Sequence, residues 1–222
     1  MSLHHHHPTD DLVFAYAGGS LDEAKSLVVA THLALCPACR GAVADAEALG
    51  GALIEDMAGE PLAGDALAAT LQRAAGRRDA AQRPPAVAPG AGTTGLVLPQ
   101  PLRSYVGGDL ADVAWKTLGP GIQHRELIRS ATGATARLLR IQPGLAVFNH
   151  GHSGQELTLV LQGSYRSGGR QFQRGDLEVA DDTVEHAPVA GSEAVCICLA
   201  VTEAPLRFKN LIGRLMQPFI GI

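Results

Sequence analysis

Two groups of residues in this chain have the types and the spacing of metal ligands. The first group is His32, Cys36 and Cys39. His32 and Cys36 are four residues apart, so they share one face of a helix, and Cys39 lies about one turn into the segment that follows. Imidazole nitrogen and thiolate sulfur are the ligands of tetrahedral structural zinc sites, so this spacing predicts a zinc site.

A tetrahedral site needs a fourth ligand, and four consecutive histidines, residues 4–7, precede the first helical segment. We assign His7, which is nearest to that segment, and keep His6 as the alternative. The competing interpretation is that Cys36 and Cys39 are buried thiols or a redox pair and that residues 4–7 remain from cloning. A thioredoxin-type pair follows a strand, whereas the residues before Cys36 have helical periodicity, so we favour zinc. Such a closed site is structural, and it stabilises a helical unit that is too small to fold without it.

The second group is His150, His152, Glu156 and His186. This part of the chain has the short apolar runs of β-strands, in which residues two apart point to the same side, so His150 and His152 share a face. Glu156 begins the next predicted strand, and His186 comes from a later one. Three imidazoles and one carboxylate suit zinc, iron, manganese, nickel or copper, and ligand type alone does not select one. A lone histidine, His124, has no such partners and is predicted to be an ordinary residue.

The first group needs helices to hold it, and the surrounding residues predict four short ones. Apolar residues recur every three or four positions between residues 9 and 77. The first helix should end at Gly18-Gly19, and Ser20 and Glu23 fit a capping box that begins the second. Pro37 suits the first position of the third helix. The predicted helices cover residues 10–17, 20–35, 37–49 and 65–75.

The second group needs a β-structure. Short β-forming runs separated by Gly and Pro predict a sandwich or small barrel. These runs are residues 134–141, 156–161, 171–172, 176–179 and 194–201. An amphipathic helix is predicted at residues 207–216, and five prolines in residues 84–102 predict an extended linker. We therefore predict a multidomain chain, α then β, with a helical zinc-binding domain at 1–80, a linker at 81–102 and a barrel domain at 103–222.

Composition and charge narrow the class of protein further. The 222 residues are 46% hydrophobic, which is enough for one or two packed cores and excludes wholesale disorder. We expect a cytoplasmic protein, because no secretory signal opens the chain and no apolar run reaches the ~20 residues of a membrane-spanning helix. The four cysteines are too few for a disulfide scaffold. Residues 1–80 carry 11 acidic and 5 basic residues, a net charge of −6 that disfavours nucleic acid and suits a basic protein partner.

The two groups carry a resemblance to known families. Residues 144–163 resemble the first cupin motif, and residues 175–186 resemble the second, with Asp181 and Thr183 where that motif usually has Pro and Gly. The pattern of His32, Cys36 and Cys39 is similar to that of the zinc-binding anti-sigma domain, as are residues 16–21 and 27–33. In this order and joined by a linker, the two parts resemble the ChrR family of anti-sigma factors over nearly the whole chain.

This resemblance implies a small zinc-bound helical bundle followed by a cupin-type β-barrel (double-stranded β-helix). It implies a regulator that sequesters an extracytoplasmic-function (RpoE-like) sigma factor and releases it on an oxidative signal, such as singlet oxygen or an organic peroxide. The cupin domain would hold a second divalent ion and sense the signal. The implied ligands are His7, His32, Cys36 and Cys39 for zinc, and His150, His152, Glu156 and His186 for the second ion.

Two other functions compete with this one. A metal-dependent cupin dioxygenase or isomerase would keep open positions at the second site for a small carbonyl substrate. We disfavour it because no second acid–base pair or arginine clamp can be assigned to the pocket, for which only Arg137 and Arg140 are candidates. Direct DNA binding is disfavoured by the charge of −6 and by the absence of a basic helix in residues 1–80.

Cys196 and Cys198 are two apart in a predicted strand, so they share one of its faces. One hypothesis is that both are ordinary core residues. The other is that they face the barrel interior near the metal and are oxidised together with it, which would change how the cupin domain contacts the helical part.

Overall fold

The computed structural model describes residues 6–80, 95–131, 133–205 and 207–208. Its described residues up to Gly50 and from Leu96 onward form one compact unit, and those of Gly51–Gly95 form another. The first two helices therefore belong to the same unit as the strands. This division into compact units does not test the predicted domains at 1–80, 81–102 and 103–222, which stay a prediction.

The four predicted helices near the N-terminus are all present, but the third continues to Glu55 and the fourth to Ala80, past their predicted ends at residues 49 and 75. The stop after the first helix is confirmed, because Gly19 has a φ of 66°, in the left-handed region. The predicted capping box is wrong: Asp22, rather than Ser20, caps the second helix by accepting the Lys25 N–H, and the Ser20 hydroxyl instead donates to Ala15 O. The described helices are α1 Asp10–Ala17, α2 Glu23–Leu35, α3 Pro37–Glu55, α4 Ala66–Ala80, α5 Gln100–Val106 and the 3-10 turn η1 Leu110–Asp112.

The last residues of the predicted linker, 100–102, are helical rather than extended, because they begin α5. Pro99 is the N-cap of α5 and Pro101 lies in its first turn, where a missing N–H costs nothing. Leu98 and Leu102 are fully buried in the core of the larger unit. Proline thus starts a helix here rather than preventing one.

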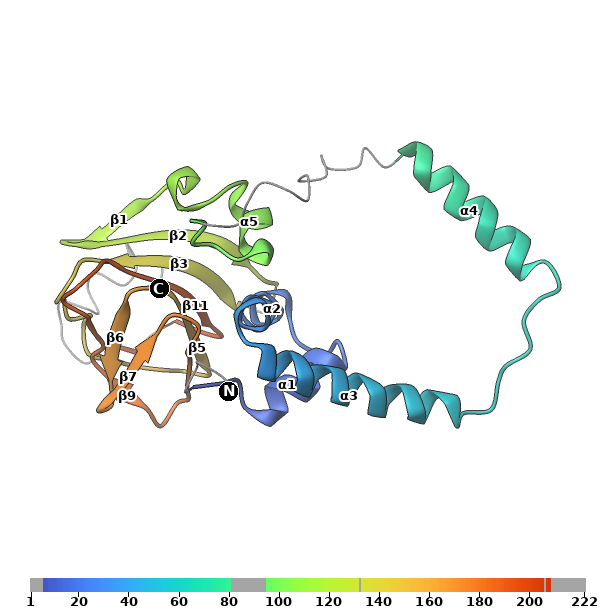
Figure 1. The fold of residues 1–222 in the computed structure, drawn as a ribbon, viewed down its shortest axis with the longest axis horizontal. Coiled ribbons are helices and arrows are strands. Elements are labelled where there is room, and N and C mark those ends of the chain that lie inside the picture. The colour runs from blue at the N-terminus through green and yellow to red at the C-terminus, as the bar shows by residue number, and fades with distance from the viewer. Residues whose placement is uncertain (1–5, 81–94, 132, 206, 209–222) are drawn as a thin grey trace. The chain divides into compact units, whose positions relative to one another are not determined.

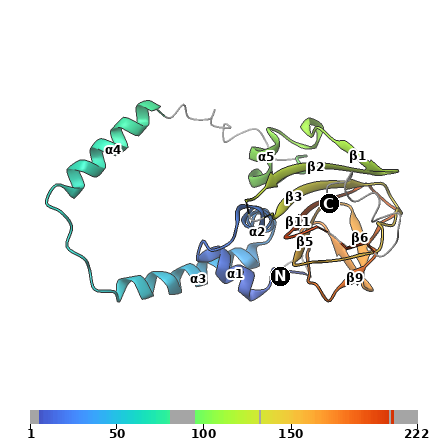
Figure 2. The same ribbon diagram turned by 180° about the vertical axis from the view of Figure 1, so that it is seen from behind.

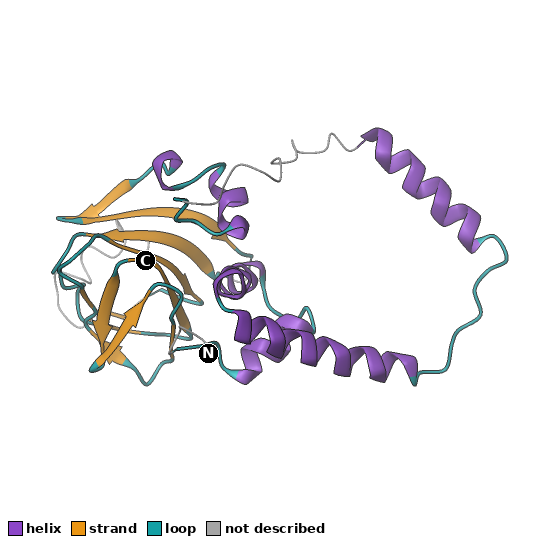
Figure 3. Ribbon diagram, in the orientation of Figure 1, coloured by secondary structure: helices purple, strands orange, loops and turns teal. Residues whose placement is uncertain are grey.

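The strands of the second half form three antiparallel sheets that wrap into a barrel (Figure 3). The largest has six strands in the order β1-β2-β3-β11-β5-β8, and the two smaller ones have the orders β10-β6-β7 and β12-β4-β9. The strands are β1 Lys116–Gly119, β2 Ile122–Arg129, β3 Thr135–Ile141, β4 His150–Gly151, β5 Glu156–Gln162, β6 Ser164–Ser167, β7 Arg170–Gln173, β8 Leu177–Ala180, β9 Glu185–His186, β10 Val189–Ala190, β11 Cys196–Thr202 and β12 Arg207–Phe208.

Sequence reasoning predicted five of these strands by their ranges and placed His150 and His186 on strands, which are β4 and β9, but it missed β1, β2, β6, β10 and β12. Its final helix is wrong at its start, because Arg207–Phe208 is a strand paired with β4. The rest of that predicted helix, residues 209–216, lies outside the described residues. Among the described helices, none combines the length and the apolar character that crossing a bilayer demands.

The six-stranded sheet separates two cores. On its outer face, α2 packs Leu27, Val28 and Val29 into a cluster with Leu199 and Leu157 of the sheet (Figures 1 and 2). Burial of each such side chain stabilises the fold by about 1.5–3 kcal/mol. The apolar face of α2 therefore binds the helix that carries His32 firmly to the barrel.

On its inner face, the sheet contributes Cys196 and Cys198 to a second cluster that includes Tyr165 and Phe172 from the smaller sheet β10-β6-β7. Ile197, which lies between the two cysteines, points to the outer cluster. This alternation along β11 places every second side chain inside the barrel, as the period of a strand requires.

Candidate metal sites

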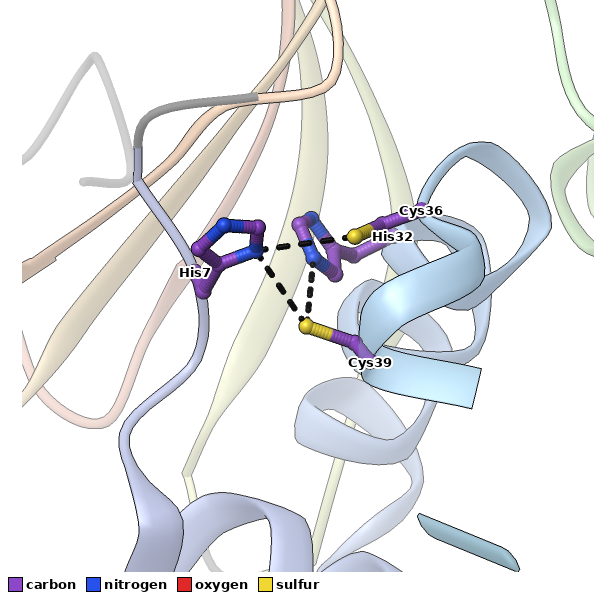
Figure 4. Close-up of side chains that lie close together, drawn as sticks. All are labelled: His7, His32, Cys36 and Cys39. Atoms are coloured by element: carbon purple, nitrogen blue, oxygen red, sulfur yellow. Dashed lines mark hydrogen bonds between the residues drawn. The ribbon is translucent and has the colours of Figure 1, made fainter. Parts of the chain in front are cut away.

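The N-terminal cluster gathers His7, His32, Cys36 and Cys39 from the segment before α1 and from the junction of α2 and α3 (Figure 4). His32 lies in the last turn of α2, Cys36 is the residue between α2 and α3, and Cys39 lies in the first turn of α3. His7 comes from the extended segment before α1. The structure thus brings the first three residues together with His7, while His6 turns its ring onto Phe172 of the barrel.

The spacing of the donor atoms in this cluster fits a tetrahedral ion. His32 Nε2 and Cys39 Sγ are 3.3 Å apart, Cys39 Sγ and His7 Nδ1 are 3.3 Å apart, and Cys36 Sγ and His7 Nδ1 are 3.5 Å apart. Bonds of about 2.0–2.3 Å to a tetrahedral zinc separate the ligand atoms by roughly 3.3–3.8 Å. The donor set and its geometry are those of a structural zinc site.

The thiol of Cys39 needs a cation in order to ionise at neutral pH. Burial raises the pKa of Cys39 to about 12, with a further contribution from the neighbouring thiol of Cys36. A thiol of that pKa is protonated at neutral pH, whereas a zinc ligand is a thiolate. Metal binding at this cluster therefore releases protons.

The second cluster lies inside the barrel, where short strands position its ligands. β4 and β9 pair His150 directly opposite His186. His152 follows the end of β4, and Glu156 is the first residue of β5. All four side chains are buried or nearly so, and their potential ligand atoms all lie within 4.8 Å of one another.

Distances inside this second cluster also match a coordination shell. His186 Nε2 lies 3.1 Å from His150 Nε2 and 3.2 Å from His152 Nε2. Glu156 Oε2 is 3.3–3.6 Å from a ring nitrogen of each of the three histidines. Imidazole nitrogens this close repel one another unless a cation or a proton lies between them, so the arrangement fits a divalent ion.

The charges of this cluster are already suited to a cation. Burial raises the pKa of Glu156, but the hydrogen bonds and charges of the surrounding histidines outweigh it and hold that pKa well below its usual range. Burial likewise lowers the pKa of His186, but Glu156 and Glu178 outweigh it and raise the pKa to about 9. The carboxylate is therefore ionised at neutral pH, and it faces the imidazole of His186, which can exchange its proton for a metal.

Groups outside the ligand set fix two of the imidazole rings. His150 Nδ1 donates a hydrogen bond to Phe148 O at 2.7 Å, which leaves Nε2 directed at the cluster centre. His186 Nδ1 lies 2.8 Å from Ser167 Oγ and 3.6 Å from Glu178 Oε1, and Glu178 also accepts the hydroxyl of Tyr165. Sequence reasoning missed these supporting residues. The one available signal was an acidic residue within an otherwise apolar strand, β8.

Three glycines at the ends of the two cupin motifs have positive φ. Gly144, Gly163 and Gly175 have φ values of 71°, 69° and 93°. Gly163 also has no room for a side chain, since a Cβ there would lie 2.7 Å from Val195 O. In the second motif, Asp181 makes the turn that the missing Pro and Gly would make, because its carboxylate accepts both the N–H and the hydroxyl of Thr183.

A small cavity of about 50 Å³ adjoins the barrel cluster. His150, Glu156 and His186 line it together with Cys198 and apolar side chains. Cys196 and Cys198 are free thiols with sulfur atoms 3.5 Å apart. The contact with the adjacent thiol of Cys196, together with burial, raises the pKa of Cys198 well above its usual value. Both thiols thus belong to the inner core cluster, as the first hypothesis requires, and Cys198 lies beside the metal ligands, as the second requires, so both hypotheses stay predictions.

His124 and the two arginines lie away from this cavity. Arg137 is buried, and it pairs with Glu126 and contacts Thr135. Arg140 bonds Gln123. Neither arginine lines the cavity beside the barrel cluster, so neither clamps a substrate there.

Known proteins match both halves of this chain. The model of the ChrR cupin-like domain family matches residues 104–205, and the model of a zinc-finger family matches residues 8–40. The anti-sigma-E factor ChrR of Cereibacter sphaeroides is 46% identical over 217 residues, which cover 98% of this chain and 98% of that protein. The chain belongs to the ChrR family.

A solved structure extends the match to three dimensions. A chain in the crystal structure of Rhodobacter sphaeroides SigE in complex with the anti-sigma ChrR is 44% identical, with a TM-score of 0.74. The match covers 90% of this chain and 99% of that chain. The predicted fold of this ChrR-family protein, N-terminal helices followed by a cupin barrel, is confirmed.

The zinc-finger match contains three of the four residues of the N-terminal cluster. His32, Cys36 and Cys39 lie inside residues 8–40, whereas His7 precedes the match by one residue. The match and the donor set together indicate zinc at this cluster. In this ChrR-family chain, the assignment of His7 thus depends on the geometry alone.

Proposed function

We propose that the protein is an anti-sigma factor that sequesters an extracytoplasmic-function sigma factor in the cytoplasm and releases it on an oxidative signal received by the cupin domain. The observation that carries this proposal is the similarity over nearly the full length to a protein named anti-sigma-E factor ChrR. The match to a chain from a SigE–ChrR complex supports the same class of partner.

The helices offer apolar surface for such a partner. On α3, Leu49, Leu53 and Ile54 are 56–69% exposed, although they are large apolar side chains. On α4, Leu67 and Leu71 are 72% and 60% exposed and lie one turn apart. Exposed apolar stripes of this kind mark protein-binding faces. The acidic charge of residues 1–80 complements a basic partner.

The two clusters would have different tasks. Zinc held by His7, His32, Cys36 and Cys39 would fix α2 against α3 and so shape the binding surface. A zinc, iron, manganese or nickel ion held by His150, His152, Glu156 and His186 would make the barrel responsive to the signal. Cys198 lines the same cavity as three of that ion's ligands, and its thiol is 3.5 Å from that of Cys196, so the pair could take part in an oxidative response.

The size of the barrel cavity favours sensing over catalysis. Pockets that bind small-molecule substrates usually enclose about 300–1,000 Å³. The cavity beside the cupin cluster is only about 50 Å³, and a buried, mostly apolar wall surrounds it. A small oxidant fits that space, whereas a diketone-like substrate of a dioxygenase does not.

A co-purification experiment tests this function. The full chain is expressed together with an extracytoplasmic-function sigma factor of the SigE type, and the complex is isolated before and after peroxide or singlet-oxygen treatment. We expect a stable complex that dissociates on treatment, and no turnover of small carbonyl substrates by the metal-loaded protein. Failure to bind the sigma factor, or substrate turnover without such binding, would favour the enzyme instead.

A further inference from the structure

The segment that carries His7 is attached to the barrel by its neighbour His6. The backbone N–H of His6 donates to Asp176 Oδ1 at 3.2 Å, and the backbone N–H of Leu177 donates to His6 O at 3.1 Å. The ring of His6 also lies on the ring of Phe172, with 4.4 Å between the ring centres. Three contacts thus hold the residue next to His7.

This attachment matters because His7 differs from the other three residues of its cluster. His32, Cys36 and Cys39 lie at the junction of α2 and α3, so the helices themselves set their spacing. His7 precedes α1 and is 25 residues away from His32 in sequence. A ligand on an unattached segment must lose conformational entropy when it binds a metal, and this loss weakens the binding. Attaching His6 to the barrel removes part of that cost.

The barrel side of the attachment is rigid. Asp176 is fully buried between β7 and β8, and its second carboxylate oxygen accepts the N–H of Gln173 at 2.9 Å. Phe172 is also buried and stacks on Tyr165, with ring centres 5.0 Å apart. Both side chains therefore present fixed partners to His6.

We propose that Asp176 and Phe172 of the barrel are positioning residues for the zinc ligand His7, so that the cupin barrel sets how tightly the N-terminal cluster holds its ion. The proposal depends on the zinc site described above and adds a physical link between the two halves of the protein. Outer partners that orient a metal ligand typically change metal affinity by about 10–100-fold when they are removed.

The strand that follows Asp176, β8, also connects this attachment to the second cluster. Glu178 of β8 is two residues from Asp176, and its carboxylate faces His186 of the second cluster at 3.6 Å. A depression of about 490 Å³ between the clusters is lined by both His7 and His186. A shift of β8 caused by a change at His186 would therefore reach His6 and His7 through two residues of chain.

Cobalt provides a direct test, because only the N-terminal cluster contains thiol ligands that give a thiolate-to-cobalt charge-transfer band. The full-length protein is loaded with Co²⁺, and loss of that band is followed against a competing chelator. We expect Asp176→Ala and His6→Ala to retain Co²⁺ about 10-fold less tightly than the wild type. His6→Phe, which preserves the ring contact with Phe172, should retain Co²⁺ as the wild type does.

A matched control removes an equivalent contact elsewhere. Asp109 accepts the backbone N–H groups of Val97 and Leu98 from another distant segment, so Asp109→Ala should leave the cobalt band as stable as in the wild type. Because His6 lies outside the barrel core, Co²⁺ retention by His6→Ala and His6→Phe tests the proposal even if Asp176→Ala does not fold.

Each failure has its own meaning. Equal retention by the wild type and His6→Ala would overturn the inference and leave the metal site in place. Weak retention by His6→Phe would also overturn it, because the imidazole itself would then be a ligand. Absence of the charge-transfer band from the wild type would overturn the zinc site on which the inference depends.

Discussion

Glu178 is the carboxylate that supports a metal ligand of the barrel without belonging to the ligand set. Burial raises its pKa, but hydrogen bonds with His186, Ser167 and Tyr165 outweigh this and lower that pKa below its usual value. The charge of Glu178 is therefore present at neutral pH beside the outer nitrogen of His186. Such a carboxylate orients the imidazole and makes its other nitrogen a better donor to a metal.

Replacing this carboxylate should weaken metal binding in the barrel. We expect Glu178→Gln to lower the affinity of the cupin cluster for a divalent ion by roughly 10-fold, because Gln cannot supply the charge that orients His186. Competition between the protein and a chelator measures this change. The matched control is Glu193→Gln, an exposed glutamate of the same barrel, which should bind metal as the wild type does.

The thiol pair of β11 gives a second residue-scale prediction. We expect the double variant Cys196→Ser, Cys198→Ser to bind the sigma factor but to release less of it after oxidant treatment, because its sensing thiols are gone. Release is measured as free sigma factor after a fixed exposure. An unaltered oxidant response would assign both cysteines to packing alone.

At the scale of elements, α2 contributes a buried leucine to the core, whereas α3 presents an exposed leucine to solvent. Leu27 of α2 is 4% exposed and packs on the outer face of the sheet. Leu53 of α3 is 64% exposed in the free protein. The first residue stabilises the fold, and the second is available to a partner.

A pair of matched truncations tests this division. Leu27→Ala should lower the free energy of unfolding by about 2–5 kcal/mol, because it leaves a cavity between α2 and the sheet. Leu53→Ala should change stability by less than about 0.5 kcal/mol but weaken binding to the sigma factor. Denaturant titration and a binding titration on both variants separate the two effects. A large loss of stability in Leu53→Ala, or unchanged stability in Leu27→Ala, would contradict this assignment.

The ion pair between Glu126 of β2 and Arg137 of β3 supplies a pH-dependent prediction. Burial raises the pKa of Glu126, but hydrogen bonding to Arg129 and the charge of the buried Arg137 outweigh it and lower that pKa. A lowered folded-state pKa means that the stabilisation is complete above the unfolded value of about 4.3 and is lost as the pH falls through the folded value.

Glu126→Gln should therefore be destabilising only where Glu126 is ionised. We expect a loss of about 1–2 kcal/mol at pH 7, reduced because Glu126 is partly exposed to solvent. The difference from the wild type should shrink towards zero as the pH falls below about 4. Unfolding curves at several pH values measure it, and a constant difference would show that the ion pair contributes nothing.

At the scale of the whole molecule, the sequence predicted local features best. The ligand spacings within residues 32–39 and 150–156, the α-then-β order and the helix stop at Gly19 depend on residues that are close in sequence, whereas His7 and His186 join their clusters from 25 and 30 residues away. The helix α5 and the strand β2 were missed because distant partners stabilise them: Leu98 and Leu102 bury against the shared core, and β2 pairs along β3. Spacing also could not reveal that His6 lies on Phe172, since 166 residues separate them.

The central claim is that an ion in the N-terminal cluster shapes the surface that binds the sigma factor. The most direct measurement is elemental analysis combined with a binding titration of the full chain, before and after chelation and in Cys39→Ser. The account predicts one zinc in the N-terminal cluster and loss of sigma-factor binding without it, while Cys196→Ser, which removes a buried thiol of the barrel, binds normally. Full-strength binding by protein with no ion in this cluster would contradict the account.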